Sequence, residues 1–398
     1  MSLDTLDRVR AGRRPLERCT GDPRSFLAND WGKRAAVRLG GPPLAGFEDL
    51  LSLDDVDRFL TTSALRAPFF RLVKAGEQIA ESAYTRSGYT GSREVSGMAD
   101  PARVATLFED GATIVLQGLH RWSEPVARFC RDFELELGHP SQINAYITPP
   151  GAQGLDLHED AHDVFVLQAF GRKHWEVHAA PREERRDPLQ VEVTSGATIY
   201  MPEGTPHSAR AQDLLSGHLT VGVHVTPWRE VLTGVVGRAL EGIEDPVAAG
   251  WTEDLDGFAD DLRGRLAALA SALGEVDVRT EAGERRERFL SNRAQLARGT
   301  IAERAASISV DDATVVARRP SSVCELVVRT DRLVVLLGDR RLEMPAWVEP
   351  AMRRIADLDE DAELTVGDLA PELPDPAGRA VLVRRLIREG LFTIRGGR

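Results

Sequence analysis

Cysteine is scarce in this chain, with three thiols among 398 residues. Cys19, Cys130 and Cys324 lie far apart and form no CxxC pair. Disulfide frameworks and structural zinc sites both need several closely spaced ligands, so the sequence suggests neither. We expect three buried thiols.

Long hydrophobic runs are also absent. No stretch approaches the roughly 18 apolar residues that a membrane helix requires. The segment that begins Met1-Ser2-Leu3-Asp4 is acidic, contains arginine and has no apolar signal region. With 42% hydrophobic and 28% charged residues, the composition is typical of a folded protein of two or three domains. We expect it in the cytoplasm, without a membrane partner.

Positive charge falls short of negative charge. The chain has 50 Lys and Arg against 62 Asp and Glu, which gives a formal net charge of -12. This balance disfavours nucleic acid as the main partner, and a basic peptide would be attracted.

The first part of the chain, up to residue 227, contains short β-rich runs separated by turn residues. They span residues 112–116, 143–148, 164–167, 174–177, 198–201 and 218–225. The last run alternates, with Leu219, Val221, Val223 and Val225 on one face, as in a barrel strand that lines a polar cavity. We therefore expect residues 1–227 to form a β-barrel or double-sheet sandwich rather than a doubly wound parallel sheet.

Helical, charge-rich sequence follows over residues 228–310. Apolar side chains recur there every three or four positions, at Leu255, Phe258, Leu262, Leu266, Leu269 and Leu273. Such an amphipathic helix must bury its apolar face, either on the barrel or on a second copy of itself.

The last part, residues 311–398, combines short apolar runs with two helical stretches and a β-like end. This order suggests a small winged-helix module. Its second helix carries Arg379, Arg384, Arg385 and Arg388, which is compatible with a nucleic-acid-binding helix. Because the chain is acidic, we favour a solvated basic face on a packing module.

The stretch His158-Glu159-Asp160-Ala161-His162 contains two overlapping metal-binding patterns. H-E-x-x-H makes a zinc hydrolase only on a helix, where residues i and i+4 share one face. The flanks disfavour a helix, because a Pro-Pro-Gly segment precedes the stretch and the strand-like run 163–167 follows it. We therefore disfavour the zinc-hydrolase interpretation.

In an extended segment, His158 and Asp160 share a face while Glu159 points away. His207, at the end of a strand and turn, is the strongest candidate for a third ligand. Two imidazoles and one carboxylate on one side of an octahedral ion leave three positions open, which suits iron(II), an α-keto acid and dioxygen. Spacing alone leaves open a chance pattern in which His207 is an ordinary loop histidine.

Longer segments carry a family resemblance. Residues 144–154, 158–160, 163–175, 200–207 and 216–220 closely resemble the JmjC-type ribosomal oxygenases of bacteria. These are cupin-fold hydroxylases of ribosomal proteins that depend on Fe(II) and 2-oxoglutarate. The resemblance implies a double-stranded β-helix with added helices, then an α-helical dimerisation region and a winged-helix-like module.

By position, the resemblance implies a role for each of eight residues. It makes His158, Asp160 and His207 the iron ligands, Lys173, Asn144 and Thr220 cofactor-binding residues, and Tyr146 and Ser216 substrate-binding residues. Electrostatics supports the role of Lys173, because the distal carboxylate of 2-oxoglutarate needs a buried cation. No side chain beyond the metal ligands need act catalytically.

The chain also departs from the family pattern. Ala197 stands where the family usually has an acidic residue, and we expect this change to alter a turn rather than the metal site. His162, His174 and His178 crowd the same region and complicate any assignment based on composition.

The resemblance implies that the protein hydroxylates the β-carbon of an arginine or histidine in a basic ribosomal protein, acting as a homodimer. The same chemistry on a non-ribosomal peptide, or demethylation of a basic side chain, is an alternative. A rival of another class is a non-catalytic winged-helix protein that binds nucleic acid, although direct nucleic-acid binding is disfavoured by the charge. The sequence does not identify the target residue.

Overall fold

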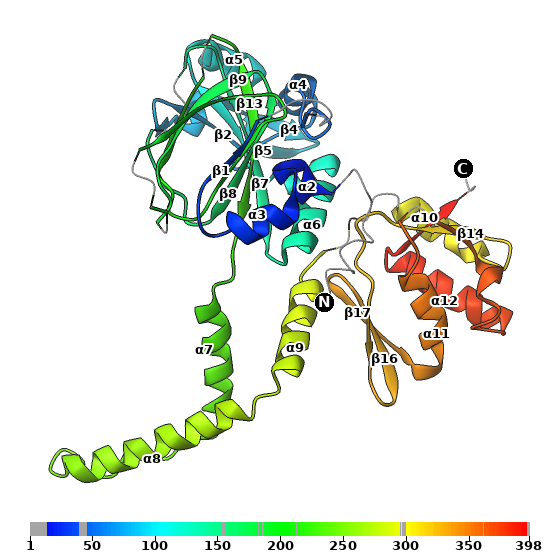
Figure 1. The fold of residues 1–398 in the computed structure, drawn as a ribbon. Coiled ribbons are helices and arrows are strands. Elements are labelled where there is room, and N and C mark those ends of the chain that lie inside the picture. The colour runs from blue at the N-terminus through cyan, green and yellow to red at the C-terminus, as the bar shows by residue number, and fades with distance from the viewer. Residues whose placement is uncertain are drawn as a thin grey trace. The chain divides into compact units, whose positions relative to one another are not determined.

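The structure is a computed structural model that describes residues 14–39, 46–152, 156–181, 183–184, 187–211, 213–294, 296, 300–360 and 362–395. Residues 1–4 and 153–154, used in the sequence interpretation, lie outside this set. The chain divides into two compact units, residues 1–225 and 226–398, coloured blue to green and green to red in Figure 1. The expected division into three domains stays a prediction.

The first unit is built on two antiparallel sheets. The larger has the strand order β1-β11-β8-β13-β7-β6-β2-β3 and the smaller the order β10-β9-β12. The larger sheet comprises β1 (Ala36–Arg38), β2 (Phe70–Lys74), β3 (Glu77–Gln78), β6 (Thr113–Leu116), β7 (Ser141–Thr148), β8 (Asp163–Phe170), β11 (Thr198–Met201) and β13 (Ser216–Val223). The smaller comprises β9 (Arg172–Val177), β10 (Leu189–Thr194) and β12 (His207–Ala211). Each β-rich run seen in the sequence overlaps one of these strands.

Alternation along the strands separates a core face from a cavity face. In β13, Leu219, Val221 and Val223 are fully buried in the largest apolar cluster, as their spacing predicted. Val225 packs partly buried against the same cluster. The opposite faces of β13 and β7 carry polar side chains, whereas β8 and β11 of the larger sheet and β9 and β10 of the smaller sheet share a second apolar cluster.

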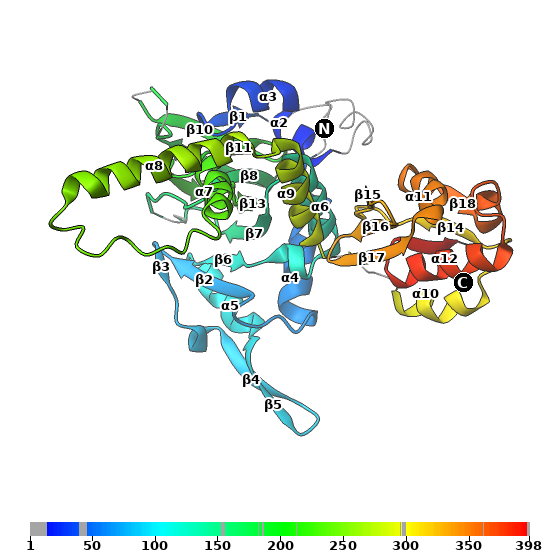
Figure 2. The same cartoon turned by 90° about the horizontal axis from the view of Figure 1, so that it is seen from below.

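Helices cover the outer face of the larger sheet. They are α2 (Pro15–Thr20), α3 (Pro23–Asn29), α4 (Leu53–Thr62), α5 (Pro101–Glu109) and α6 (Glu124–Leu137). Phe26, Phe59 and Phe133 from three of them join the apolar cluster of β7 and β13. Side-chain caps fix several starts, for example the capping box of Ser52 and Asp55 on α4. A hairpin, β4 (Thr85–Thr90) and β5 (Arg93–Ala99), projects from this unit (Figure 2).

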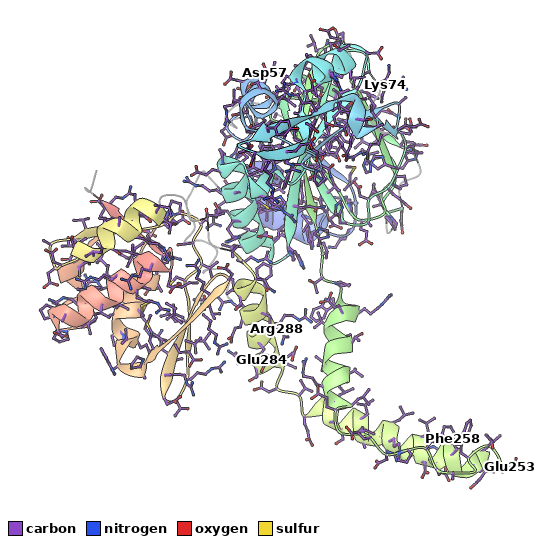
Figure 3. All side chains as sticks on the ribbon, turned by 180° about the vertical axis from the view of Figure 1, so that it is seen from behind. Asp57, Lys74, Glu253, Phe258, Glu284 and Arg288 are labelled. Carbon is purple, nitrogen blue, oxygen red and sulfur yellow. The ribbon has the colours of Figure 1, made fainter. Side chains whose placement is uncertain are left out.

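The second unit starts with helices that expose apolar side chains. They are α7 (Trp228–Ala239), α8 (Leu255–Gly274), α9 (Val278–Ser291) and α10 (Thr300–Ala306). In the single chain, Leu255 is 64% exposed and Leu266 57%. Figure 3 shows the side chains of α8, with Phe258 labelled. The amphipathic helix expected from the sequence is present, and its apolar face is largely open to solvent within one chain.

The remainder of the second unit has its own apolar core. It contains the sheets β18-β14-β19 and β15-β16-β17, together with two helices. The bounds are β14 (Val315–Arg318), β15 (Glu325–Val328), β16 (Arg332–Leu337), β17 (Arg340–Pro345), α11 (Glu349–Ala356), β18 (Glu363–Thr365), α12 (Pro376–Arg388) and β19 (Phe392–Arg395).

Three of the four arginines of α12 are engaged within this unit. Arg379 is buried and pairs with Asp312 at 2.6 Å. Arg385 pairs with Glu389, and Arg384 donates to the backbone oxygen of Val310. This arrangement favours the interpretation of α12 as a packing helix.

Two further observations concern the cysteines and the hydrophobicity of the helices. Cys19 and Cys130 are buried free thiols, whereas Cys324 is only partly buried by exposed area. None of the helices in the described ranges is long and apolar enough to cross a membrane.

Candidate functional site

The backbone around His158 is extended rather than helical. The His158 amide donates to the His207 carbonyl at 3.1 Å, and the His207 amide donates to the His158 carbonyl at 2.8 Å. These two bonds form an isolated antiparallel β-bridge. Because no helix carries residues 156–162, the H-E-x-x-H geometry of a zinc hydrolase is excluded.

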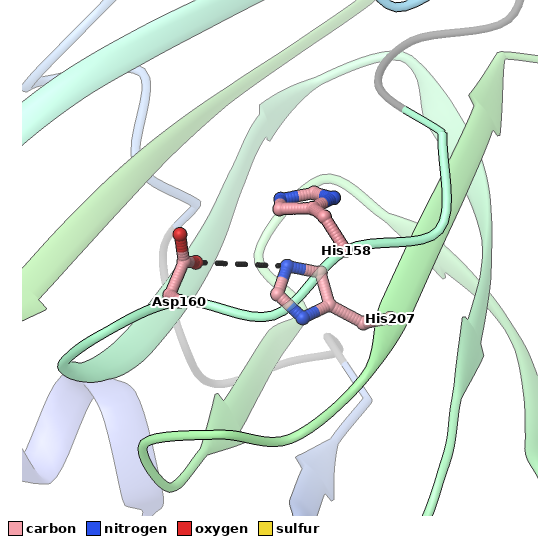
Figure 4. Close-up of side chains that lie close together, drawn as sticks. All are labelled: His158, Asp160 and His207. Carbon is pink, nitrogen blue, oxygen red and sulfur yellow. Dashed lines mark ion pairs between the residues drawn. The ribbon is translucent and has the colours of Figure 1, made fainter.

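Three potential metal ligands meet at this bridge. The ligand atoms of His158, Asp160 and His207 all lie within 4.8 Å of one another. His207 Nε2 is 3.6 Å from Asp160 Oδ2 (Figure 4). The cluster therefore combines two imidazoles and one carboxylate, as the sequence predicted.

Backbone carbonyls orient both imidazoles. His158 Nδ1 lies 2.7 Å from the Asp156 carbonyl oxygen, and His207 Nδ1 lies 2.8 Å from that of Thr205. A proton on each Nδ1 donates to the carbonyl and leaves Nε2 free to bind a metal. Burial lowers the pKa of His207, although the bond to Thr205 opposes this shift. A neutral imidazole is the form that binds a metal ion.

The other histidines near this region have separate environments. His174 Nε2 lies 2.7 Å from Gln190 Oε1, and His178 Nε2 lies 2.9 Å from Glu176 Oε1. The rings of His162 and His224 make an edge-to-face contact. Among the described residues, His158, Asp160 and His207 form the only group of three or more His, Cys, Asp or Glu side chains that could hold a metal ion. Their two nitrogens and one oxygen fit Fe(II) with half of an octahedron left open.

A cavity of about 270 Å³ opens beside the cluster. It is lined by Arg71, Val73, Thr113, Val115, Tyr146, His158, Asp160, Val164, Val166, Lys173, Trp175, His207, Ala209, His218 and Thr220. Strand pairing sets four of these in one row, because Arg71 lies opposite Val115, Val115 opposite Tyr146, and Tyr146 opposite His218. The tyrosine and histidine rings stack at 5.1 Å with an angle of 7° between them.

Lys173 is the buried cation of this cavity. Its side chain is almost fully enclosed, and Nζ donates to Thr148 Oγ1 at 3.1 Å. Thr148 Oγ1 in turn lies 3.1 Å from Thr113 Oγ1. Burial lowers the pKa of Lys173 to about 7, and no carboxylate of the described residues pairs with it. An anion entering the cavity would remove this cost, which fits the distal carboxylate of 2-oxoglutarate.

The other predicted site residues divide into two groups. Tyr146 and Thr220 line the cavity. Asn144 and Ser216 are not among the lining residues. The Asn144 side-chain oxygen accepts from the Gly118 amide at 2.9 Å, and Ser216 Oγ accepts from Gln168 Nε2 at 2.9 Å. The binding roles of these four residues stay predictions.

Sequence reasoning missed several cavity residues, among them Arg71, Thr113, Trp175 and His218. One signal was available for Trp175, because residues two apart on a strand share a face and Trp175 follows Lys173 by two. Trp175 Nε1 and His218 Nδ1 are buried polar atoms without a hydrogen-bond partner among the described residues. Such unpartnered atoms beside a cavity fit a site that takes up a polar ligand.

The geometry defines a class. Two facing antiparallel sheets with a His-x-Asp and a distal histidine at one end form a double-stranded β-helix, the cupin fold. Residues 120–231 match the family model of the JmjC domain. The chain therefore carries a JmjC domain, and it is homologous to the ribosomal oxygenases, as the following comparisons show.

The curated relatives match about half of this chain. Ribosomal oxygenase 1 of Rattus norvegicus is 28% identical over 244 residues, which cover 56% of this chain and 39% of the relative. Ribosomal oxygenase 2 of Mus musculus is 28% identical over 292 residues, which cover 62% of this chain and 59% of the relative. The chain thus spans about two fifths of the length of the first relative.

A solved structure matches nearly the whole chain. The Escherichia coli ribosomal oxygenase YcfD has a TM-score of 0.53 at 19% identity, covering 95% of this chain and 99% of that one. A second structure of YcfD, in complex with cobalt and 2-oxoglutarate, gives a TM-score of 0.54. At this identity the likeness shows the fold, and the expected cupin-type barrel with added helices is confirmed.

Proposed function

We propose that the protein is an Fe(II)- and 2-oxoglutarate-dependent dioxygenase that hydroxylates a side chain of a protein substrate, with a ribosomal protein as the substrate class. One observation carries the proposal. The cluster of His158, Asp160 and His207 opens on the same cavity as the buried, unpaired ammonium of Lys173. A metal-binding keto acid with a second carboxylate matches both features at once.

Each residue has a defined task in this proposal. His158, Asp160 and His207 hold Fe(II), and Lys173 binds the distal carboxylate with Thr148 and Thr113 around it. Bound iron and 2-oxoglutarate supply oxidative decarboxylation to succinate and transfer of an oxygen atom to a C–H bond. The protein positions one C–H bond near the metal and excludes others.

Further residues shape the cofactor and substrate sites. Thr220 and Asn144 are proposed to contact the cofactor, and Tyr146 and Ser216 the substrate. Tyr146 and Thr220 have the stronger support, because they line the cavity. The side chains of Asn144 and Ser216 bond to the protein itself and would act by shaping the wall.

The relatives support the substrate class. Several are named ribosomal oxygenases, and one from Dictyostelium discoideum is named a bifunctional lysine-specific demethylase and histidyl-hydroxylase. We propose the β-carbon of an arginine or histidine as the target. A basic substrate suits a chain with a net charge of -12. Demethylation, or hydroxylation of a non-ribosomal peptide, is the alternative with the same chemistry.

We propose three functional parts: the catalytic domain (residues 1–227), a helical dimerisation region (228–310) and a winged-helix-like domain (311–398). The exposed apolar side chains of α7 and α8 support dimerisation, because a single chain leaves them in water. The paired arginines of α12 speak against the rival function of a nucleic-acid-binding protein.

The test is to incubate the iron-loaded protein with 2-oxoglutarate and ribosomal proteins, and to measure succinate and intact masses. A gain of one oxygen on a ribosomal protein supports the proposal, whereas loss of a methyl group indicates demethylation. His158→Ala and His207→Ala should each abolish succinate formation. Glu159→Gln is the matched control, because this exposed residue lies between two ligands. Unchanged turnover in both alanine variants would refute the proposed function.

A further inference from the structure

Arg71 places a second cation in the cavity wall. It lies on β2, whose side chains alternate between two environments. Phe70 and Leu72 are buried in the large apolar cluster, whereas Arg71 and Val73 line the cavity. The strand therefore presents a guanidinium to the same space that the metal cluster and Lys173 face.

The guanidinium has no carboxylate partner within the described part of the chain. Its side chain hydrogen-bonds to the Tyr146 hydroxyl, which is a neutral acceptor. Several arginines of the first unit differ in this respect, for example Arg18, which pairs with Asp49, and Arg172, which pairs with Asp213. Arg71 thus keeps an uncompensated positive charge at the cavity.

Arg71 and Lys173 reach the cavity from different sheets. Arg71 lies on β2 of the larger sheet, and Lys173 lies on β9 of the smaller sheet. Lys173 alone can pair with the distal carboxylate of 2-oxoglutarate. The guanidinium of Arg71 is therefore available to bind a second anion.

A count of charges supports this separation. Once Fe(II) and 2-oxoglutarate are bound, the dication and dianion cancel, and Asp160 cancels Lys173. Arg71 leaves the cavity with one excess positive charge, since a guanidinium stays protonated in proteins. An unpaired charge in a partly desolvated space is costly, so an anion that arrives with the substrate would be favoured and a cation disfavoured.

We propose that Arg71 determines substrate specificity by binding the carboxylate of an aspartate or glutamate next to the target residue, and by excluding cationic side chains from the cavity. This inference rests on the proposed function and narrows it. It favours a neutral histidine over an arginine as the oxidised residue. A bidentate pair with a carboxylate is the geometry that a guanidinium offers best.

The test selects a random-sequence peptide library on the immobilised full-length protein loaded with Mn(II) and 2-oxoglutarate, and needs no turnover. The wild type should enrich aspartate or glutamate at one position. Arg71→Gln should reduce this enrichment about tenfold, because a charge-assisted bond is lost, and Arg71→Lys should retain part of it. Arg71→Glu should select lysine or arginine instead.

Lys74→Gln is the matched control. It removes one positive charge from the same strand, where Figure 3 labels Lys74. Lys74 lies outside the cavity lining, and it pairs with Asp110. Its selection should equal that of the wild type. Enrichment of lysine or arginine by the wild type, no enrichment at all, or an acidic preference that survives in Arg71→Gln would overturn the inference.

Loss of 2-oxoglutarate affinity in Arg71→Gln, as large as that in Lys173→Met, would overturn it as well, because Arg71 would then be a cosubstrate ligand. The proposed function fails separately, when the iron-loaded protein forms no succinate. Melting temperatures of all variants identify any that fail to fold.

Discussion

At the scale of single residues, the burial of the Lys173 ammonium group indicates that its ligand is negatively charged. The ammonium lies almost fully enclosed beside two threonine hydroxyls, and burial lowers its pKa to about 7. A bound carboxylate favours the charged form and raises this pKa again. Binding of a dicarboxylate near neutral pH is therefore linked to uptake of a proton by the protein.

This linkage gives a pH dependence. Below pH 7 the ammonium is already protonated, so the affinity of the Mn(II)-loaded protein for 2-oxoglutarate should vary little with pH. Above pH 7 the affinity should fall by up to about tenfold for each pH unit, because binding must then supply the proton. Calorimetry in buffers of different ionisation enthalpy measures both the affinity and the proton uptake.

Lys173→Met should weaken 2-oxoglutarate binding and remove the pH dependence, whereas Lys74→Met, at an exposed lysine, should leave both unchanged. An affinity that stays constant between pH 7 and 9 in the wild type would contradict the link to Lys173.

The individual site residues differ in how far the sequence could predict them. His158 and Asp160 are two apart in an extended segment, and the resemblance supplied Lys173, so short spacing or a motif identified each. Arg71 lies in a different part of the chain, and its partner Tyr146 is two strands away. Only the register of β2, β6 and β7 places them in one row, and no local pattern contains that register.

At the scale of secondary-structure elements, the turn between β8 and β9 positions Lys173. Gly171 occupies it with φ +67°. A Cβ atom there would lie 1.7 Å from the Leu215 carbonyl oxygen. Both the backbone conformation and the close approach of a neighbouring strand therefore require glycine.

Gly171→Ala should destabilise the first unit by roughly 3 kcal/mol, because the left-handed conformation and the backbone clash both add cost. Gly32→Ala is the matched control. Gly32 has a φ of +64° but an added Cβ meets no atom within 4 Å, so it should cost only about 1 kcal/mol. Denaturant unfolding measures both. Equal losses in the two variants would show that the contact with Leu215 contributes nothing.

Apolar or alternating runs predicted several strands, and other strands were missed. The run at residues 143–148 corresponds to β7, and that at 218–225 overlaps β13. β12 was missed, since its sequence His-Ser-Ala-Arg-Ala has little β propensity and pairing with β9 decides its conformation. β1 and β3 are two or three residues long, too short to show a period.

At the scale of the whole molecule, the helical region stands out because many of its apolar side chains are exposed within one chain. α8 leaves Leu262 45% and Leu266 57% exposed within one chain. The sequence predicted this amphipathic face but left open what covers it. Periodicity identifies an apolar stripe and contains no information about the surface that packs against it.

Leu262→Glu should convert a homodimer to a monomer, because a charge would enter the apolar interface. Ser271→Glu adds the same charge on the opposite side of α8 and should leave the dimer intact. Light scattering coupled to size-exclusion chromatography gives the mass. A monomeric wild type would refute the proposed dimer, and a dimer that survives Leu262→Glu would place the interface elsewhere.

The hydrogen-bonded pairing of His158 with His207 has a consequence for which metal ion the protein binds. Strand pairing holds the two imidazoles close together, and with Asp160 they form a set of three donors. Two nitrogens and one oxygen bind first-row divalent ions in the Irving–Williams order, in which copper and zinc outrank ferrous iron. Which ion is acquired is therefore decided by cellular supply, and protein made in zinc-rich medium has to be stripped and refilled before assay.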